Sequence, residues 1–160
     1  MNSPIISPNE FISSVLLNIT EDGFTLLQQA VTNGEESVIE TVIGWYKDLK
    51  LTESEEFIRT ILLNITSDGF TLLQTAVKTE SNLIIDAIID LFRCSNLIES
   101  DIFLTTQLLN ITNDGFTLLQ SAIKSTKPDI IKTIYNIYAE ANVIGSDDFK
   151  DTILLHATAD

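Results

Sequence analysis

The chain has 160 residues, a formal net charge of −14 at pH 7 and a pI of about 4.2. Hydrophobic residues make up 44% of it, which excludes an intrinsically disordered chain and is enough to build a buried core. The acidic surface should repel phosphate backbones and anionic lipids, so we expect neither nucleic acid nor a membrane as a partner.

Cysteine and histidine content excludes further classes. The single cysteine, Cys94, cannot form an intramolecular disulfide, and with the single histidine, His156, it cannot make a typical structural zinc site. We therefore expect no metal or other cofactor. The N-terminus lacks the basic and apolar regions of a secretory signal. The most apolar run, residues 83–92, is short and contains Asp86 and Asp90, so it cannot span a membrane. These features predict a cytoplasmic protein.

One string of 15 residues recurs every 46 residues. LLNITEDGFTLLQQA begins at Leu16, LLNITSDGFTLLQTA at Leu62 and LLNITNDGFTLLQSA at Leu108. A fourth copy begins at Leu154 as LLHATAD. The repetition predicts a single repeat domain over residues 1–160, with units of about 8–53, 54–99 and 100–145 and a partial fourth unit, 146–160. Because the last copy stops at Asp160, a fragment of a longer array and a terminal capping helix both stay open.

The first predicted helix in the chain starts at Ser7 and Pro8, a favourable helix start, and has one apolar stripe. The stripe consists of Phe11, Ile12, Val15, Leu16 and Ile19. The second copy of this helix repeats the stripe as Phe57, Ile58, Ile61, Leu62 and Ile65. The later copies begin at predicted N-caps that acidic residues follow, namely Ser54, Ser100 and Ser146.

Two more helices complete each unit. The pattern T-L-L-Q at Thr25, Thr71 and Thr117 predicts a capping box, and the Asp-Gly before it supplies a tight turn. The next helix is predicted over residues 36–50, and residues 83–92 and 130–138 repeat it. Its apolar stripe consists of Val38, Ile39, Val42, Ile43, Tyr46 and Leu49. Each apolar face is too large to stay exposed, so neighbouring units should stack into an all-α solenoid.

Residues 22–43, DGFTLLQQAVTNGEESVIETVI, resemble an ankyrin repeat, whose pattern DGxTPLHxAAxxGHxxVVxxLL aligns without a gap. Asp22, Gly23 and Thr25 occupy the positions of the family's turn and cap, and Gly34 that of the glycine between its helices. Residues 68–89 and 114–135 align in the same way. The resemblance implies a right-handed α-solenoid of three-helix, ankyrin-like repeats.

The chain departs from the ankyrin pattern at several positions. The family's proline is replaced by Leu26, Leu72 and Leu118, and its histidine by Gln28, Gln74 and Gln120. The glycine between the helices is kept only at Gly34, with Glu80 and Thr126 in the other units. The period is 46 residues instead of about 33, and the extra residues predict the third helix. A three-helix armadillo or HEAT-like solenoid is the alternative, because its period range includes 46.

Several residue patterns have two interpretations. Asn-Ile-Thr at Asn18, Asn64 and Asn110 matches a glycosylation acceptor, but its place at a helix end favours a hydrogen-bonding role, which His156 would take over in the fourth copy. The acidic clusters could serve acid–base or metal chemistry, but their position at helix starts favours dipole complementarity. The clusters are Glu53, Glu55 and Glu56; Glu99 and Asp101; and Asp147, Asp148 and Asp151.

The in-register aromatic residues Tyr46, Phe92 and Tyr138 are predicted to lie in the core instead of forming a ligand-stacking stripe. Trp45 has Leu91 and Ile137 at the equivalent positions of the other units and is predicted to be structural. We expect Cys94 to be a free, buried cysteine.

The function predicted from these patterns is a non-enzymatic protein–protein interaction scaffold, acting as a monomer. Positions that vary between otherwise identical copies are the candidate partner-binding residues, and the resemblance implies that they line the concave face. They are Glu21, Ser67 and Asn113 in the turn, and Gln29, Thr75, Ser121, Thr32, Lys78 and Lys124 on the helix that follows. The charge of the chain favours a partner with a basic surface.

Other functions stay open at this point. The chain could be a structural or spacer segment of a larger protein. An enzyme that uses carboxylates such as Asp147 and Asp148 is a further hypothesis. Abundant isoleucine and asparagine are typical of AT-rich genomes, and ankyrin-like arrays are common among effectors of intracellular bacteria. Delivery into a host cell as a bacterial effector is therefore another hypothesis.

Overall fold

The computed structural model describes residues 7–157, with side chains up to residue 152. Over this range the chain is all-helical, without a β-strand, which confirms the predicted all-α class. Its helices are α1 (Pro8–Phe11), η1 (Ile12–Leu16), α2 (Leu26–Asn33), α3 (Glu36–Asp48), α4 (Glu55–Phe57), η2 (Ile58–Leu62), α5 (Leu72–Lys78), α6 (Asn82–Cys94), α7 (Asp101–Phe103), η3 (Leu104–Leu108), α8 (Leu118–Lys124), α9 (Pro128–Glu140) and α10 (Asp147–Ala157).

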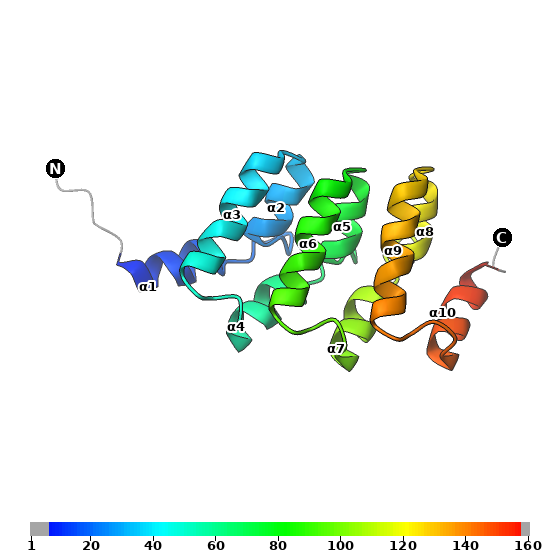
Figure 1. The fold of residues 1–160 in the computed structure, drawn as a ribbon. Helices are drawn as coiled ribbons and strands as arrows, with labels where there is room; N and C mark the ends of the chain where they lie inside the picture. Colours follow the sequence, from blue (N-terminus) through cyan, green and yellow to red (C-terminus); the bar gives the residue numbers. More distant parts are fainter. Residues whose placement is uncertain (1–6, 158–160) are drawn as a thin grey trace.

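Three antiparallel helix pairs stand side by side in a row, α2 with α3, α5 with α6, and α8 with α9 (Figure 1). The first helices of the pairs pack on one another, α2 on α5 and α5 on α8. The second helices do the same, α3 on α6 and α6 on α9. The short segments that precede the pairs, and α10, line one side of the row (Figure 1). Each successive unit therefore adds one helix pair to the row.

The helix that begins each pair starts as the sequence predicts. The Thr25 hydroxyl accepts the backbone N–H of Gln28, and the Gln28 side chain accepts the backbone N–H of Thr25. The same reciprocal bonds occur at Thr71 and Thr117. All three threonines are buried, so these capping boxes satisfy backbone donors that water could not reach.

The helix that precedes each pair is shorter than predicted and changes its winding part of the way along. The caps are confirmed, because Ser54 and Ser100 accept the N–H groups of Phe57 and Phe103. After one α-turn, however, the chain winds as a π-turn, with the Leu63 N–H donating to the Ile58 carbonyl at 3.0 Å. Since η2 ends at Leu62, Ile65 lies beyond the helix and is exposed, as is Ile19. Placing Ile19 and Ile65 on the buried stripe was therefore wrong.

Aromatic pairs fill the core between successive units. Tyr46 packs on Phe57 with ring centroids 4.7 Å apart, and Phe92 packs on Phe103 at 4.9 Å. Tyr138 packs on Phe149 at 5.5 Å. The first residue of each pair is fully buried, which confirms the predicted core role of the series. The Tyr46 hydroxyl also donates to the Leu16 carbonyl at 3.0 Å, and Tyr138 donates to Leu108 in the same way at 2.6 Å.

Several further residues are more exposed than predicted, among them Val15, Val38 and Leu49 of the apolar stripes. Cys94 is exposed, as are the charged residues Asp48 and Glu140 at the equivalent positions of the other units, so this position faces solvent in every unit. Trp45 is 42% exposed, although its equivalents Leu91 and Ile137 are buried. Those two residues belong to units that pack on a preceding helix pair, whereas Trp45 belongs to the first pair and contacts Phe11 edge-on.

The turn between the paired helices keeps one backbone conformation in all three units. Gly34 is left-handed with φ of 73°, and its equivalents Glu80 and Thr126 are left-handed too, at 55° and 58°. L-residues with side chains adopt this region at a cost of roughly 1–2 kcal/mol. The loss of glycine at these two positions has therefore not changed the turn.

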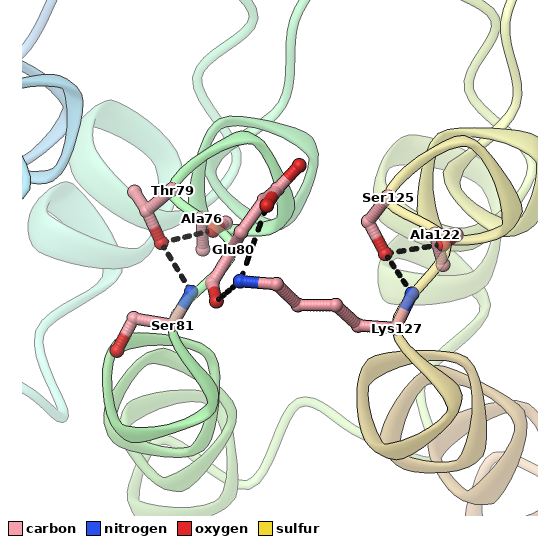
Figure 2. A network of polar contacts seen from close by, with 7 residues as sticks. All are labelled: Ala76, Thr79, Glu80, Ser81, Ala122, Ser125 and Lys127. Atoms are coloured by element: carbon pink, nitrogen blue, oxygen red, sulfur yellow. Dashed lines mark hydrogen bonds and ion pairs between the residues drawn. The ribbon is translucent and has the colours of Figure 1, made fainter.

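A lysine ties the turns of the second and third units together (Figure 2). Lys127 Nζ donates to the Glu80 carbonyl at 2.9 Å and lies 3.1 Å from the Glu80 carboxylate. Within each turn a hydroxyl caps the preceding helix, Thr79 donating to Ala76 and Ser125 to Ala122, both at 2.7 Å. The two turns are therefore held at a fixed spacing.

Candidate functional site: a groove along the first helices of the pairs

The second and third asparagines of Asn-Ile-Thr each fix their unit to the one before it. Asn64 Nδ2 donates to the Gly23 carbonyl and to Gln28 Oε1, both at 2.7 Å. Asn110 repeats the arrangement with Gly69 at 2.8 Å and Gln74 at 2.9 Å. The predicted hydrogen-bonding role is confirmed at these two positions. The side chain of their counterpart His156 lies outside the described residues.

The Asp-Gly turns lie against one another as a consequence. Ser67 Oγ donates to the Asp22 carbonyl at 2.8 Å, and Asn113 Nδ2 donates to the Ser67 carbonyl at 2.9 Å. Gly69 has a φ of +82°, and a Cβ there would lie only 2.9 Å from the backbone nitrogen of Asn113. This close approach requires glycine at position 69, and the hydrogen bonds between the turns join them into one continuous edge.

Beside this edge two hollows of about 330 and 380 Å³ follow the first helices of the pairs. Residues of the first and second units line one hollow: Phe24, Thr32, Gly34, Asp68, Phe70, Thr75, Lys78 and Thr79. Residues of the second and third units line the other: Phe70, Val77, Lys78, Glu80, Asp114, Phe116, Ser121, Lys124 and Ser125. Because Phe70 and Lys78 line both, we treat the hollows as one feature and call it the inner groove.

Two ammonium groups lie over phenyl rings in the inner groove. Lys78 Nζ is 4.0 Å from the centroid of the Phe70 ring, and Lys124 Nζ is 4.4 Å from that of Phe116. At exposed sites such a contact contributes about 0.5–1 kcal/mol, so it orients the lysine without neutralising it. The groove therefore presents oriented positive charges on a protein that is acidic overall.

A carboxylate stands next to these lysines. The pKa of Asp114 is lowered, mainly by a hydrogen bond from the Thr112 side chain, with smaller contributions from its own backbone N–H and from Lys78 and Lys124. The second and third units thus bring phenyl, ammonium and carboxylate groups together on the wall of the groove, and the first unit adds the phenyl ring of Phe24. Such a wall can contact an extended polypeptide through both apolar and charged side chains.

Most of the candidate residues taken from the sequence lie at the inner groove. Thr32, Thr75, Lys78, Ser121 and Lys124 line it, and Asn113 lies beside Lys78 at its edge. Thr75 is almost fully buried, and its hydroxyl donates to the Thr71 carbonyl, so it contributes little surface.

The other candidates lie elsewhere. Glu21 and Ser67 are exposed on the turns, and Gln29 is exposed on α2. Ser67 and Asn113 also hold neighbouring turns together, which gives them a structural role besides any contact with a partner.

Sequence reasoning missed the phenylalanines of the groove, Phe24, Phe70 and Phe116. They are identical in the three complete copies, so differences between the copies do not single them out. The available signal was their place directly before a capping threonine, because the N4 residues Gln29, Thr75 and Ser121 are polar and offer no apolar staple partner. All three phenylalanines are partly exposed.

Comparison with known proteins identifies no family for this chain, so a function has to be inferred from the geometry of the inner groove. No protein-family model matches the chain, and the search of curated proteins gave no significant match either. Among the described residues, no three histidine, cysteine or acidic side chains are close enough together to hold a metal ion. No helix in the described part of the chain is long and apolar enough to cross a membrane.

Proposed function

We propose that the protein is a non-enzymatic interaction scaffold, a right-handed solenoid of ankyrin-like repeats that holds a protein partner in the inner groove. The observation that supports this most is the continuity of the groove across three units, with Phe70 and Lys78 shared between its two hollows. The proposal is also supported by the ankyrin-like resemblance, which implies a concave, partner-binding face on these same helices.

The charges suggest how a partner would be recognised. A chain with a net charge of −14 attracts a basic surface at long range. Inside the groove, the ammonium groups of Lys78 and Lys124 favour an acidic or carbonyl group, placed next to apolar side chains that meet Phe70 and Phe116. The proposed partner therefore has a basic surface overall and at least one acidic side chain in the segment that enters the groove. We expect the protein to meet this partner in the cytoplasm. If the protein is a bacterial effector, this is the cytoplasm of the host cell.

Charge reversal in the groove tests the proposal. Tagged wild-type protein and a Lys78→Glu/Lys124→Glu variant are used to capture proteins from a cell lysate. Lys47→Glu/Lys132→Glu is the matched control with the same change of charge, since both lysines are exposed on the second helices of their pairs, α3 and α9. Proteins retained by the wild type and the control, and lost by the double variant, are the candidate partners. The affinity of a purified partner should fall roughly tenfold or more in the double variant.

The opposite result is equally informative. If the double variant is folded by circular dichroism and recovers every protein that the wild type recovers, the inner groove is not the binding face. The alternative of a structural or spacer segment would then be preferred.

A further inference from the structure

The lysines and phenyl rings of the inner groove recur at equivalent positions of successive units. Lys124 and Phe116 lie 46 residues after Lys78 and Phe70, and each ammonium group lies over the ring of its own unit. The helices that carry the two lysines, α5 and α8, pack directly on each other (Figure 1). Packed helices have axes about 8–10 Å apart. The two ammonium groups therefore repeat along the groove at about that step.

The step of the groove matches one extended backbone conformation. A polyproline II helix has about three residues per turn and rises about 3.1 Å per residue, so the side chains of residues i and i+3 point the same way about 9 Å apart. In a β-strand, the side chains that share a face are about 7 Å or about 13 Å apart. An α-helix reaches a similar separation only between residues i and i+7, and with a diameter of about 10–12 Å it is a bulkier occupant. Hollows of about 330 and 380 Å³ therefore favour the slender polyproline II segment.

The two lysines of the groove are available to a partner. Both are exposed, and neither belongs to an ion pair within the part of the chain that the structure describes. We propose that the segment bound in the inner groove is a polyproline II stretch with two acidic side chains three residues apart, one on Lys78 and one on Lys124. This inference rests on the proposed function and names the chemistry of its partner.

The first unit has a neutral residue at the same step. Thr32 is the equivalent of Lys78 and lines the first hollow together with Phe24. A partner residue three positions from the acidic pair, on the side of the first unit, therefore meets a hydroxyl group and a phenyl ring. We expect that residue to be uncharged.

The carboxylates of the groove restrict what surrounds the acidic pair. Asp68 and Asp114 line the groove beside the lysines, and the whole chain has a net charge of −14. An acidic pair is thus attracted by the two ammonium groups at short range but repelled by the protein at long range. Basic residues on both sides of the pair would reverse the long-range repulsion. The bound segment is therefore an acidic pair between basic flanks.

Fluorescence anisotropy with labelled synthetic peptides tests the spacing. Each peptide has two glutamates among proline and alanine residues and two lysines at each end. The peptide with glutamates three residues apart should bind about threefold to tenfold more tightly than peptides of the same composition with glutamates two or four residues apart. It should also bind more tightly than an alanine-rich helical peptide with glutamates seven residues apart. The Lys78→Glu/Lys124→Glu variant should lose this preference.

A gain-of-function variant tests the register of the groove. Thr32→Lys adds a third ammonium group at the neutral step beside Phe24, so a peptide with three glutamates at three-residue steps should bind it about two- to fivefold more tightly than the wild type. Thr41→Lys on α3 is the matched control. Both threonines are exposed, and both hydroxyls donate to a carbonyl one turn earlier at 2.8 Å, that of Gln28 or of Ser37.

Circular dichroism establishes that each variant is folded. Equal affinity for all the peptides, including no measurable binding of any, would overturn the inference, as would a preference for a spacing of two, four or seven residues. So would a Thr32→Lys variant that gains no more affinity than Thr41→Lys. These outcomes leave the proposed function standing, because that proposal fails separately, when the charge-reversed variant captures every protein that the wild type captures.

Discussion

The side-chain amide of Asn110 donates to Oε1 of Gln74 at 2.9 Å, across 36 positions of the chain. Gln74 is fully buried and closes the capping box of α5, while Gln74 Nε2 donates back to the Asn110 carbonyl at 3.2 Å. This reciprocal contact joins the start of one helix pair to the connection that leads into the next. The stacking of the units therefore depends on polar contacts as well as on apolar burial.

Asn110→Ala should lower the free energy of unfolding by about 1–3 kcal/mol, because it removes the donor to Gln74 and to the Gly69 carbonyl. Asn18→Ala is the matched control, since Asn18 is exposed and has no unit before it in the described chain. We expect a change within about 0.5 kcal/mol for that variant. Urea denaturation followed by circular dichroism measures both. Equal losses of stability in the two variants would contradict the proposal that the Asn110 contacts hold neighbouring units together.

Thr126→Gly should raise the free energy of unfolding by about 0.5–1 kcal/mol. The β-branched Thr126 has a φ of 58°, and the relief of that strain exceeds the extra chain entropy of glycine. Thr126→Ala removes the side chain but keeps a Cβ at positive φ, so it should give no comparable gain. Thermal denaturation compares the two, and equal stability would show that φ is not the cause.

Gln107→Ile should stabilise the protein by about 1–3 kcal/mol. Gln107 is fully buried, and among the described residues neither its Nε2 nor its Oε1 has a hydrogen-bond partner. Its equivalent Ile61 is buried at the same place in the second unit. The reciprocal variant Ile61→Gln should lose stability by a similar amount. A loss of stability in Gln107→Ile would mean that the amide is satisfied in solution.

Stability should fall at alkaline pH. Burial raises the pKa of both Tyr46 and Tyr138 well above the ordinary value near 10. The folded state favours the neutral phenols. Their contribution to the free energy of unfolding is therefore fully present below a pH of about 10 and is lost as the pH rises above that value. Phenolate absorbance should then appear together with unfolding. In the double variant Tyr46→Phe/Tyr138→Phe the alkaline loss should shrink, and unchanged behaviour would assign it to other groups.

The sequence predicts what is decided locally. The capping boxes at Thr25, Thr71 and Thr117 and the caps at Ser54 and Ser100 depend on residues three positions apart, and all were predicted. The exposure of Ile65 was not, because it depends on the residue at which a π-turn ends. The exposure of Trp45 was not either, since it depends on which unit lies next to it.

The candidate site was likewise predicted only in part from the sequence. Comparing copies identified Lys78 and Lys124, because their positions differ from that of Thr32 in the first unit. It passed over Phe70 and Phe116, which are constant. The groove itself arises only when neighbouring units pack together, and residues far apart in the chain then line one wall.

Small-angle X-ray scattering on dilute protein tests the central claim, the open stack of repeated units, most directly. A compact domain of 160 residues has a radius of gyration of about 15 Å. We predict a clearly larger value and an asymmetric distance distribution with an extended tail, as expected for helix pairs standing in a row. A symmetric distribution with a radius of gyration of about 15 Å would contradict the stack.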